Sequence, residues 1–113
     1  MNKEFKLKKS EKFQETFEKG KNIPYKNLFY VKYTKNNFDT AKIGLAVSKK
    51  HGNAPYRNHV KRQVRSIFSN LNLSKLKTNN YIFIFSKNFC ELKYKDKKEI
   101  LEEFYKKIIN GKF

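Results

Sequence analysis

The chain has 113 residues and a formal net charge of +17, with 38% hydrophobic and 16% aromatic residues. This length favours one domain over residues 1–113 with a small core, and the aromatic content argues against a disordered basic tail. The excess of positive charge favours a polyanionic partner, which could be nucleic acid, an anionic membrane surface or an acidic protein.

Cysteine content and hydropathy narrow the class of protein further. Cys90 is the only cysteine, so the chain has no internal disulfide and no cysteine-based zinc site, which suits a reducing cytoplasm. The lysine-rich N-terminus lacks the apolar segment of a secretory signal. No run of about 18 apolar residues is present that could cross a bilayer. We therefore expect a cytoplasmic protein that does not bind a membrane.

A short helix is predicted near the N-terminus. Residues 1–9 are rich in lysine, and we expect them to be flexible. A helix is predicted over residues 11–19, and Gly20 is suited to end it. Phe13 and Phe17 lie four residues apart and therefore share one face of that helix. The simplest interpretation is that this face packs on the core.

Strands are predicted next. Residues 21–27 contain a proline and indicate an irregular or edge segment. Residues 28–34 alternate as a strand with three side chains on one face: Phe29, Val31 and Tyr33. Residues 43–48 predict a second strand, which we expect to pair with the first as a hairpin. One face of this second strand has small side chains that leave room for another layer or a ligand: Gly44, Ala46 and Ser48.

One predicted helix contains all three arginines of the chain: Arg57, Arg62 and Arg65. Its apolar residues recur at helical spacing and form one stripe: Val60, Val64, Ile67, Phe68 and Leu71. At about 100° per residue, the cations fall on a neighbouring stripe. Guanidinium groups form planar, two-pronged hydrogen bonds to phosphate oxygens. The pattern predicts one helix face in the core and an adjacent face that binds phosphates in a fixed geometry.

The last third of the chain completes the predicted fold. Residues 81–85 are continuously apolar and indicate a strand buried on both faces. A final helix is expected after residues 87–94, and Asp96 favours the N-terminal end of this helix. Its apolar face is made of Ile100, Leu101, Phe104, Tyr105, Ile108 and Ile109. The order α-β-β-β-α-β-α predicts an α/β two-layer sandwich, in which helices pack on a small mixed sheet.

No catalytic constellation is apparent. His51 and His59 flank the basic stretch, but no nucleophile with a carboxylate to orient it accompanies them. Acidic residues are absent between Thr40 and Cys90, so this half of the chain lacks the carboxylates of a two-metal nuclease centre. We expect no catalytic residue, no metal ligand and no cofactor bound by the protein alone.

Two segments in the middle of the chain form a recognisable pair of motifs. The first, from Ile43 to Lys50, reads IGLAVSKK, and the second, from Arg57 to Arg62, reads RNHVKR. Together they resemble the signature of the bacterial ribonuclease P protein component, which has a G-[LF]-x-[VI]-[SA]-K-K strand end and an R-N-R-x-K-R helix. His59 departs from this pattern because the family usually has arginine there. We expect the missing fixed charge to weaken one RNA contact.

The resemblance implies both a fold and a function. The strand–helix–strand unit would form a left-handed crossover, although such units are right-handed as a rule. The protein would be the non-catalytic subunit of ribonuclease P, the ribonucleoprotein that removes the 5′ leader from precursor tRNA. It would bind the catalytic RNA, one protein per RNA, and the leader of precursor tRNA. The RNA would be the catalyst, with Mg²⁺ held mainly by RNA and substrate.

Two sets of site residues follow. The RNA-binding set comprises Lys49, Lys50, Arg57, Asn58, His59, Lys61, Arg62 and Arg65. The resemblance also implies a groove for the leader, on whose aromatic side chains unpaired bases would stack. Its residues would be Phe13, Phe17, Val31, Tyr33, Ala46 and Ser48. A plain hydrophobic core would explain these aromatic residues as well.

Other functions stay open on the residues alone. A ribosomal or other structural RNA-binding protein would share the charge and the arginine helix, but would not prefer tRNA with a leader. A stand-alone nuclease would use His51 or His59 and would cleave without an RNA cofactor. A helix-turn-helix DNA-binding protein is disfavoured because strands flank the arginine helix.

Overall fold

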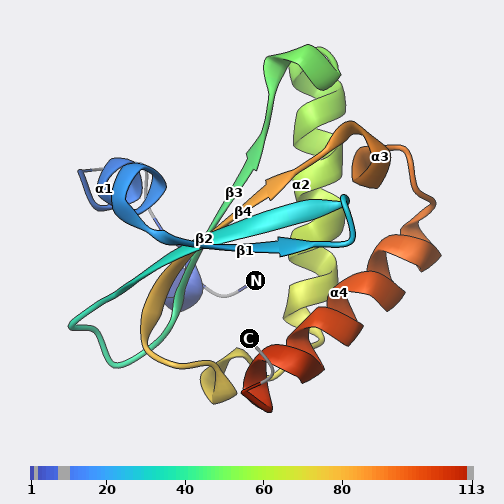
Figure 1. Ribbon diagram of the computed structural model, residues 1–113. Helices are drawn as coiled ribbons and strands as arrows, with labels where there is room; N and C mark the ends of the chain where they lie inside the picture. Colours follow the sequence, from blue (N-terminus) through green and yellow to red (C-terminus); the bar gives the residue numbers. More distant parts are fainter. Residues whose placement is uncertain (2, 8–10, 112–113) are drawn as a thin grey trace.

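A computed structural model describes residues 1, 3–7 and 11–111, in which helices pack on both faces of a four-stranded sheet (Figure 1). The seven predicted helices and strands occur in the predicted order, and the short helix α3 and three 3-10 helices are added. In chain order they are η1 (Lys3–Phe5), α1 (Glu11–Lys19), β1 (Lys21–Tyr25), β2 (Phe29–Lys35), β3 (Lys42–Val47), η2 (Lys49–His51), α2 (Ala54–Ser69), η3 (Leu73–Lys75), β4 (Asn79–Phe85), α3 (Lys87–Cys90) and α4 (Tyr94–Ile109).

The sheet is mixed, with strand order β1-β2-β4-β3. β2 pairs antiparallel with both β1 and β4, while β3 pairs parallel with β4. The predicted hairpin between β2 and β3 is therefore wrong, because β4 lies between them. The apolar side chains of β4 are buried on both faces, which a central position provides.

β1 takes the hairpin position beside β2, at the edge of the sheet. Pro24 is compatible with this place because an edge strand does not need every N–H for the ladder. The parallel pair of β3 and β4 is joined through α2, so the predicted strand–helix–strand crossover is present. Its left-handedness stays a prediction.

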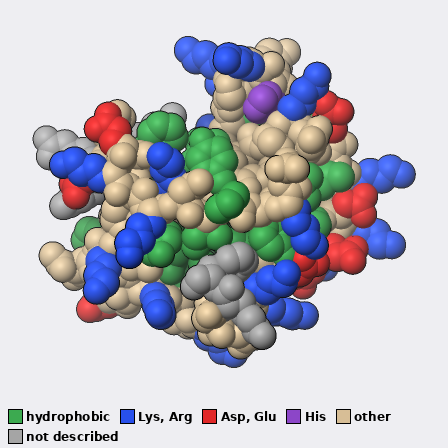
Figure 2. Space-filling view, viewed as in Figure 1, with side chains coloured by type: hydrophobic (Ala, Val, Ile, Leu, Met, Phe, Trp, Pro, Cys, Tyr) green, Lys and Arg blue, Asp and Glu red, His purple; other side chains and the backbone are tan. Residues whose placement is uncertain are grey.

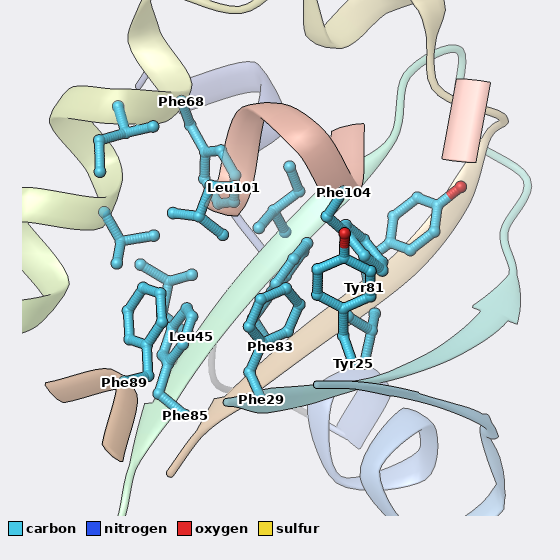
Figure 3. Close-up of a cluster of buried hydrophobic side chains, with 14 of the residues drawn as sticks. Tyr25, Phe29, Leu45, Phe68, Tyr81, Phe83, Phe85, Phe89, Leu101 and Phe104 are labelled. Carbon is cyan, nitrogen blue, oxygen red and sulfur yellow. The ribbon is translucent and has the colours of Figure 1, made fainter. Parts of the chain in front are cut away.

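The register assigns each strand residue to one face of the sheet. Val31 is paired with Phe83, and Phe83 with Leu45, so these three side chains share a face. That face packs against α2, α3 and α4 and forms the main core. Figure 3 shows its aromatic centre, where the ring of Phe29 lies 5.7 Å from that of Phe83 and 5.2 Å from that of Phe104.

The opposite face of the sheet is covered by α1. A hydroxyl hydrogen bond of 3.0 Å joins Thr16 of α1 to Thr34 of β2. A Cβ atom on Gly44 would lie 2.6 Å from the ring of Phe13, so glycine is required for the helix to approach this closely. The expectation that the small side chains of β3 leave room for another layer is confirmed at Gly44.

The N-terminal segment is attached to the free edge of β3. The Leu7 N–H donates a 2.9 Å hydrogen bond to the Ile43 carbonyl, and the Leu7 side chain is buried. The predicted flexibility of residues 1–9 is therefore wrong for Lys6 and Leu7, while residues 2, 8 and 9 lie outside the described residues. This short pairing covers part of an otherwise open strand edge.

A lysine is buried between α2 and α4. Only 3% of Lys97 is exposed, and its Nζ donates a 2.6 Å hydrogen bond to Oε1 of Gln63. Burial lowers the pKa of Lys97 below its ordinary value of 10.5, and Cys90 opposes this shift. The folded state therefore gives up this proton at a lower pH than the unfolded chain does.

We expect wild type to gain stability relative to a Lys97→Met variant as the pH rises from 7 toward 10.5. In that window the unfolded chain binds more protons at this site than the folded protein, so raising the pH favours folding. Urea unfolding of both proteins across this range measures the difference. The control is Lys98→Met, which removes an exposed ammonium. A difference between wild type and Lys97→Met that does not change with pH would contradict the expected linkage.

Candidate RNA-binding surface

The start of α2 is fixed by local contacts. Asn53 caps the helix, since its Oδ1 accepts a 3.0 Å hydrogen bond from the Tyr56 N–H. A Cβ atom on Gly52 would lie 2.5 Å from the Tyr56 ring, so only glycine fits this turn. Ser48 in turn caps η2 by accepting a hydrogen bond from the Lys50 N–H. These caps hold the exposed lysines of η2 immediately before the arginine helix.

The faces of α2 follow the predicted pattern. The buried residues are Val60, Val64, Ile67 and Phe68, and Leu71 beyond the helix is partly buried. Arg57, Lys61 and Arg65 are half-buried beside this stripe, whereas Arg62 and His59 are exposed farther around the helix. The cationic side chains of α2 thus extend from the edge of the core, where they are half-buried, to the side of the helix where they are exposed.

A cavity of about 370 Å³ lies between this face, β3 and the N-terminal part of the chain. Asn58, Lys61 and Arg65 line it from α2, while Gly44 of β3 and Phe13 of α1 line it from the sheet side. We call it the β3 cavity. It brings Phe13, assigned by sequence to the leader groove, beside three residues assigned to the RNA-binding set.

The β3 cavity is electrostatically positive. Its described lining residues include Lys6, Lys61 and Arg65 and no carboxylate. Neither Arg62 nor Arg65 forms a side-chain hydrogen bond or ion pair with another described residue, and the Nε of Arg57 is buried with no hydrogen bond to that part of the chain. The guanidinium groups of Arg62 and Arg65 therefore have donors available for an anionic ligand.

Acidic side chains gather elsewhere on the molecule. Figure 2 shows them mainly over α1 and along α4. Glu103 of α4 pairs with Lys26 at 2.5 Å and with Lys107 at 3.8 Å, and it also accepts a hydrogen bond from Tyr25. Lysines of the α4 side therefore have neighbouring carboxylates.

The residues predicted for the leader groove do not all lie on one face of the sheet. Val31 is completely buried, and Val31 and Tyr33 face the main core, on the other side of the sheet from Phe13 and Phe17. The side chains of a strand alternate between faces, so the neighbouring residues lie on the α1 side. Two residues that the sequence interpretation missed are thus Tyr30 and Lys32.

The revised set, which we call the α1-side surface, comprises Phe13, Phe17, Tyr30, Lys32, Ala46 and Ile84. The Nζ of Lys32 lies 5.2 Å from the centroid of the Phe17 ring, and Phe17 is 38% exposed. Ser48 is exposed beyond the end of β3. The small side chains on one face of β3 are the sequence signal for this surface. The residues of β2 that lie on the same face follow only from the strand register.

In the part of the chain that the structure describes, no group of three histidine, cysteine, aspartate or glutamate side chains could hold a metal ion. No described helix has both the length and the apolar composition needed to span a bilayer.

The fold and the cationic face together define a class, namely small basic α+β proteins that offer guanidinium and aromatic groups to nucleic acid. The family model for ribonuclease P matches residues 1–109. The ribonuclease P protein component of Bacillus pumilus is 35% identical over 107 residues, which cover 95% of this chain and 90% of that protein.

Solved structures agree with this match. The ribonuclease P protein of Staphylococcus aureus superposes with a TM-score of 0.79 at 29% identity, covering 93% of this chain and 97% of that one. The protein from Thermotoga maritima gives a TM-score of 0.76 at 29% identity, with 91% and 96% covered. The chain belongs to the ribonuclease P protein family, which implies an RNA partner and a part in tRNA processing.

Proposed function

We propose that this protein is the non-catalytic subunit of ribonuclease P and binds both the catalytic RNA and the 5′ leader of precursor tRNA. The observation that carries the proposal is the β3 cavity, where Asn58, Lys61 and Arg65 of α2 lie beside Phe13 of α1. Phosphate-binding groups and an aromatic side chain therefore border the same hollow. A single RNA strand needs both kinds of contact.

Each surface has a separate role in this proposal. The predicted RNA-binding set on η2 and α2 docks on the catalytic RNA through phosphate contacts, which position the protein without reading sequence. The α1-side surface holds the leader, with bases stacked on Phe17 and Tyr30 and a phosphate near Lys32. Holding the leader raises substrate affinity and orients the scissile phosphate, while the positive charge reduces repulsion between two RNAs.

The remaining assignments are also proposals. One protein binds each RNA, and the complex works in the cytoplasm. The RNA is the catalyst, and Mg²⁺ is held by RNA and substrate. In this proposal the protein acts by binding and orienting the two RNAs and holds no metal ion of its own.

Cleavage of a precursor tRNA at low Mg²⁺, by a bacterial ribonuclease P RNA with and without this protein, tests the proposal. We expect cleavage at the mature 5′ end only when both components are present. RNA binding without rescue of cleavage would instead indicate a structural RNA-binding protein. Cleavage by the protein alone would indicate a nuclease site of its own, and His51→Ala and His59→Ala would then locate it.

A further inference from the structure

A second cavity lies on the core side of the sheet, far from the α1-side surface. Its volume is about 170 Å³, and its walls come from β1, β2, β4, η3 and the C-terminal end of α4. We call it the Tyr33 cavity. Tyr33, which the sequence assigned to the leader groove, lines this cavity instead. The aromatic side chain of Tyr33 therefore needs a role other than leader binding.

The Tyr33 cavity has the walls of a slot for a flat ring. The rings of Tyr33 and Tyr81 lie side by side, with centroids 6.2 Å apart and planes tilted by 32°. Ile23 of β1 and Ile108 of α4 supply aliphatic walls. Tyr33 is only half-buried, so part of its ring remains available to a ligand. Apolar side chains also gather over the middle of the sheet in Figure 2.

The cavity also contains polar groups that a purely apolar ligand would leave unsatisfied. Asn79 is only 9% exposed, and its Nδ2 donates a 3.2 Å hydrogen bond to Oη of Tyr81. The Oδ1 of Asn79 has no hydrogen-bond partner among the described residues. This oxygen can accept a hydrogen bond from a ligand with its own N–H donor, as nucleobases have.

The rim of the cavity is cationic. Lys75 and Lys77 line it and are exposed, and none of its described lining residues is acidic. A planar slot, a buried amide and two ammonium groups together complement a base and its phosphate. They do not match a lipid chain, which brings no N–H donor for Asn79, and the ammonium groups of Lys75 and Lys77 would find no anionic partner on an apolar peptide.

We propose that the Tyr33 cavity binds an unpaired nucleotide of the catalytic RNA, with the base against Tyr33 and the phosphate beside Lys75 or Lys77. The identity of this RNA rests on the proposed function. The catalytic RNA is favoured over the leader because the cavity opens on the core side of the sheet. Lys75 also follows the end of α2 closely in the chain, so RNA docked along α2 continues toward the cavity.

The nucleotide site can be tested without any other component. Protein with labelled isoleucine methyl groups is titrated with 5′-AMP or ribose 5-phosphate and observed by NMR. We expect AMP to shift the Ile23 and Ile108 signals, ribose 5-phosphate to shift them less, and Tyr33→Leu to weaken the AMP response at least fivefold. Ile100 of α4, which lines neither the Tyr33 cavity nor the α1-side surface, is the internal control. Shifts at Ile100 as large as those at Ile23 and Ile108, or no shifts at Ile23 and Ile108, would overturn the assignment.

The source of the nucleotide is tested with the complex. We expect Lys75→Gln/Lys77→Gln to weaken binding of the catalytic RNA about threefold to tenfold, with the preference for precursor over mature tRNA unchanged. A loss of affinity restricted to precursor tRNA would overturn the assignment of the Tyr33 cavity to the catalytic RNA. AMP shifts at Ile108 without rescue of cleavage would keep the nucleotide site and overturn the proposed function. Rescue without AMP shifts would overturn the cavity assignment alone.

Discussion

Replacing Arg62 and Arg65 together by glutamine should weaken binding of the catalytic RNA by about one hundredfold at moderate salt. Both guanidinium groups lack ion-pair partners among the described residues, and Arg65 lines the β3 cavity. A hydrogen bond to a charged group contributes about 1.5 kcal/mol or more, and about 1.4 kcal/mol corresponds to a tenfold change in affinity. Filter binding or fluorescence anisotropy with labelled RNA measures the loss.

The control removes the same charge from a different surface. Lys95 and Lys98 are exposed on α4, where carboxylates are neighbours, so Lys95→Gln/Lys98→Gln should change affinity by less than about threefold. Salt dependence gives a second readout, because each lost phosphate contact lowers the slope of log affinity against log salt by about 0.7–0.9. Equal losses for both double variants would mean that only net charge matters and that α2 has no specific role.

Replacing Phe17 by alanine should weaken precursor tRNA binding in the complex by about 5-fold to 100-fold, with little effect on mature tRNA. Phe17 is 38% exposed on the α1-side surface, so its ring is accessible for stacking. Stacking of one base on an aromatic ring contributes about 1–3 kcal/mol. Dissociation constants for the two tRNAs, measured with wild type and variant complexes, give the ratio directly.

Tyr94→Ala is a matched control because Tyr94 is also 38% exposed but lies on α4. It should leave the ratio of precursor to mature tRNA affinity unchanged. Tyr30→Ala should act in the same direction as Phe17→Ala, since both side chains belong to the α1-side surface. A selective effect of Tyr33→Leu on precursor tRNA, without one for Phe17→Ala, would contradict the assignment of the two sheet faces.

Local features of the fold were predictable from the sequence because their causes are local. The apolar spacing of α2 depends on residues within a few turns, and it is confirmed. The five apolar residues of YIFIF also marked a strand with two buried faces, and the structure has it in the sheet centre. These patterns reflect the burial of side chains directly, so a single sequence is sufficient to predict these two elements.

The strand pairing and the composition of the α1-side surface were not predictable in the same way. The alternation of β2 divides its residues into two faces, but it does not say which face meets α1. The resemblance implies a groove that includes Val31 and Tyr33, but both side chains face the core. Pairing of β2 with β4 joins residues about fifty positions apart, and no local pattern encodes such a contact.

The central place of β4 has a consequence for synthesis of the chain. β3 has no strand neighbour among the described elements until β4 pairs with it, and β4 is followed only by α3 and α4. A nascent chain that stops before residue 79 can form the β1–β2 hairpin, but it has no sheet on which β3, α1 and α2 can be arranged together. Long-range pairing of this kind is completed late in folding. Both proposed RNA-binding surfaces should therefore form almost together, which limits the time in which an incompletely folded cationic chain could bind other RNAs.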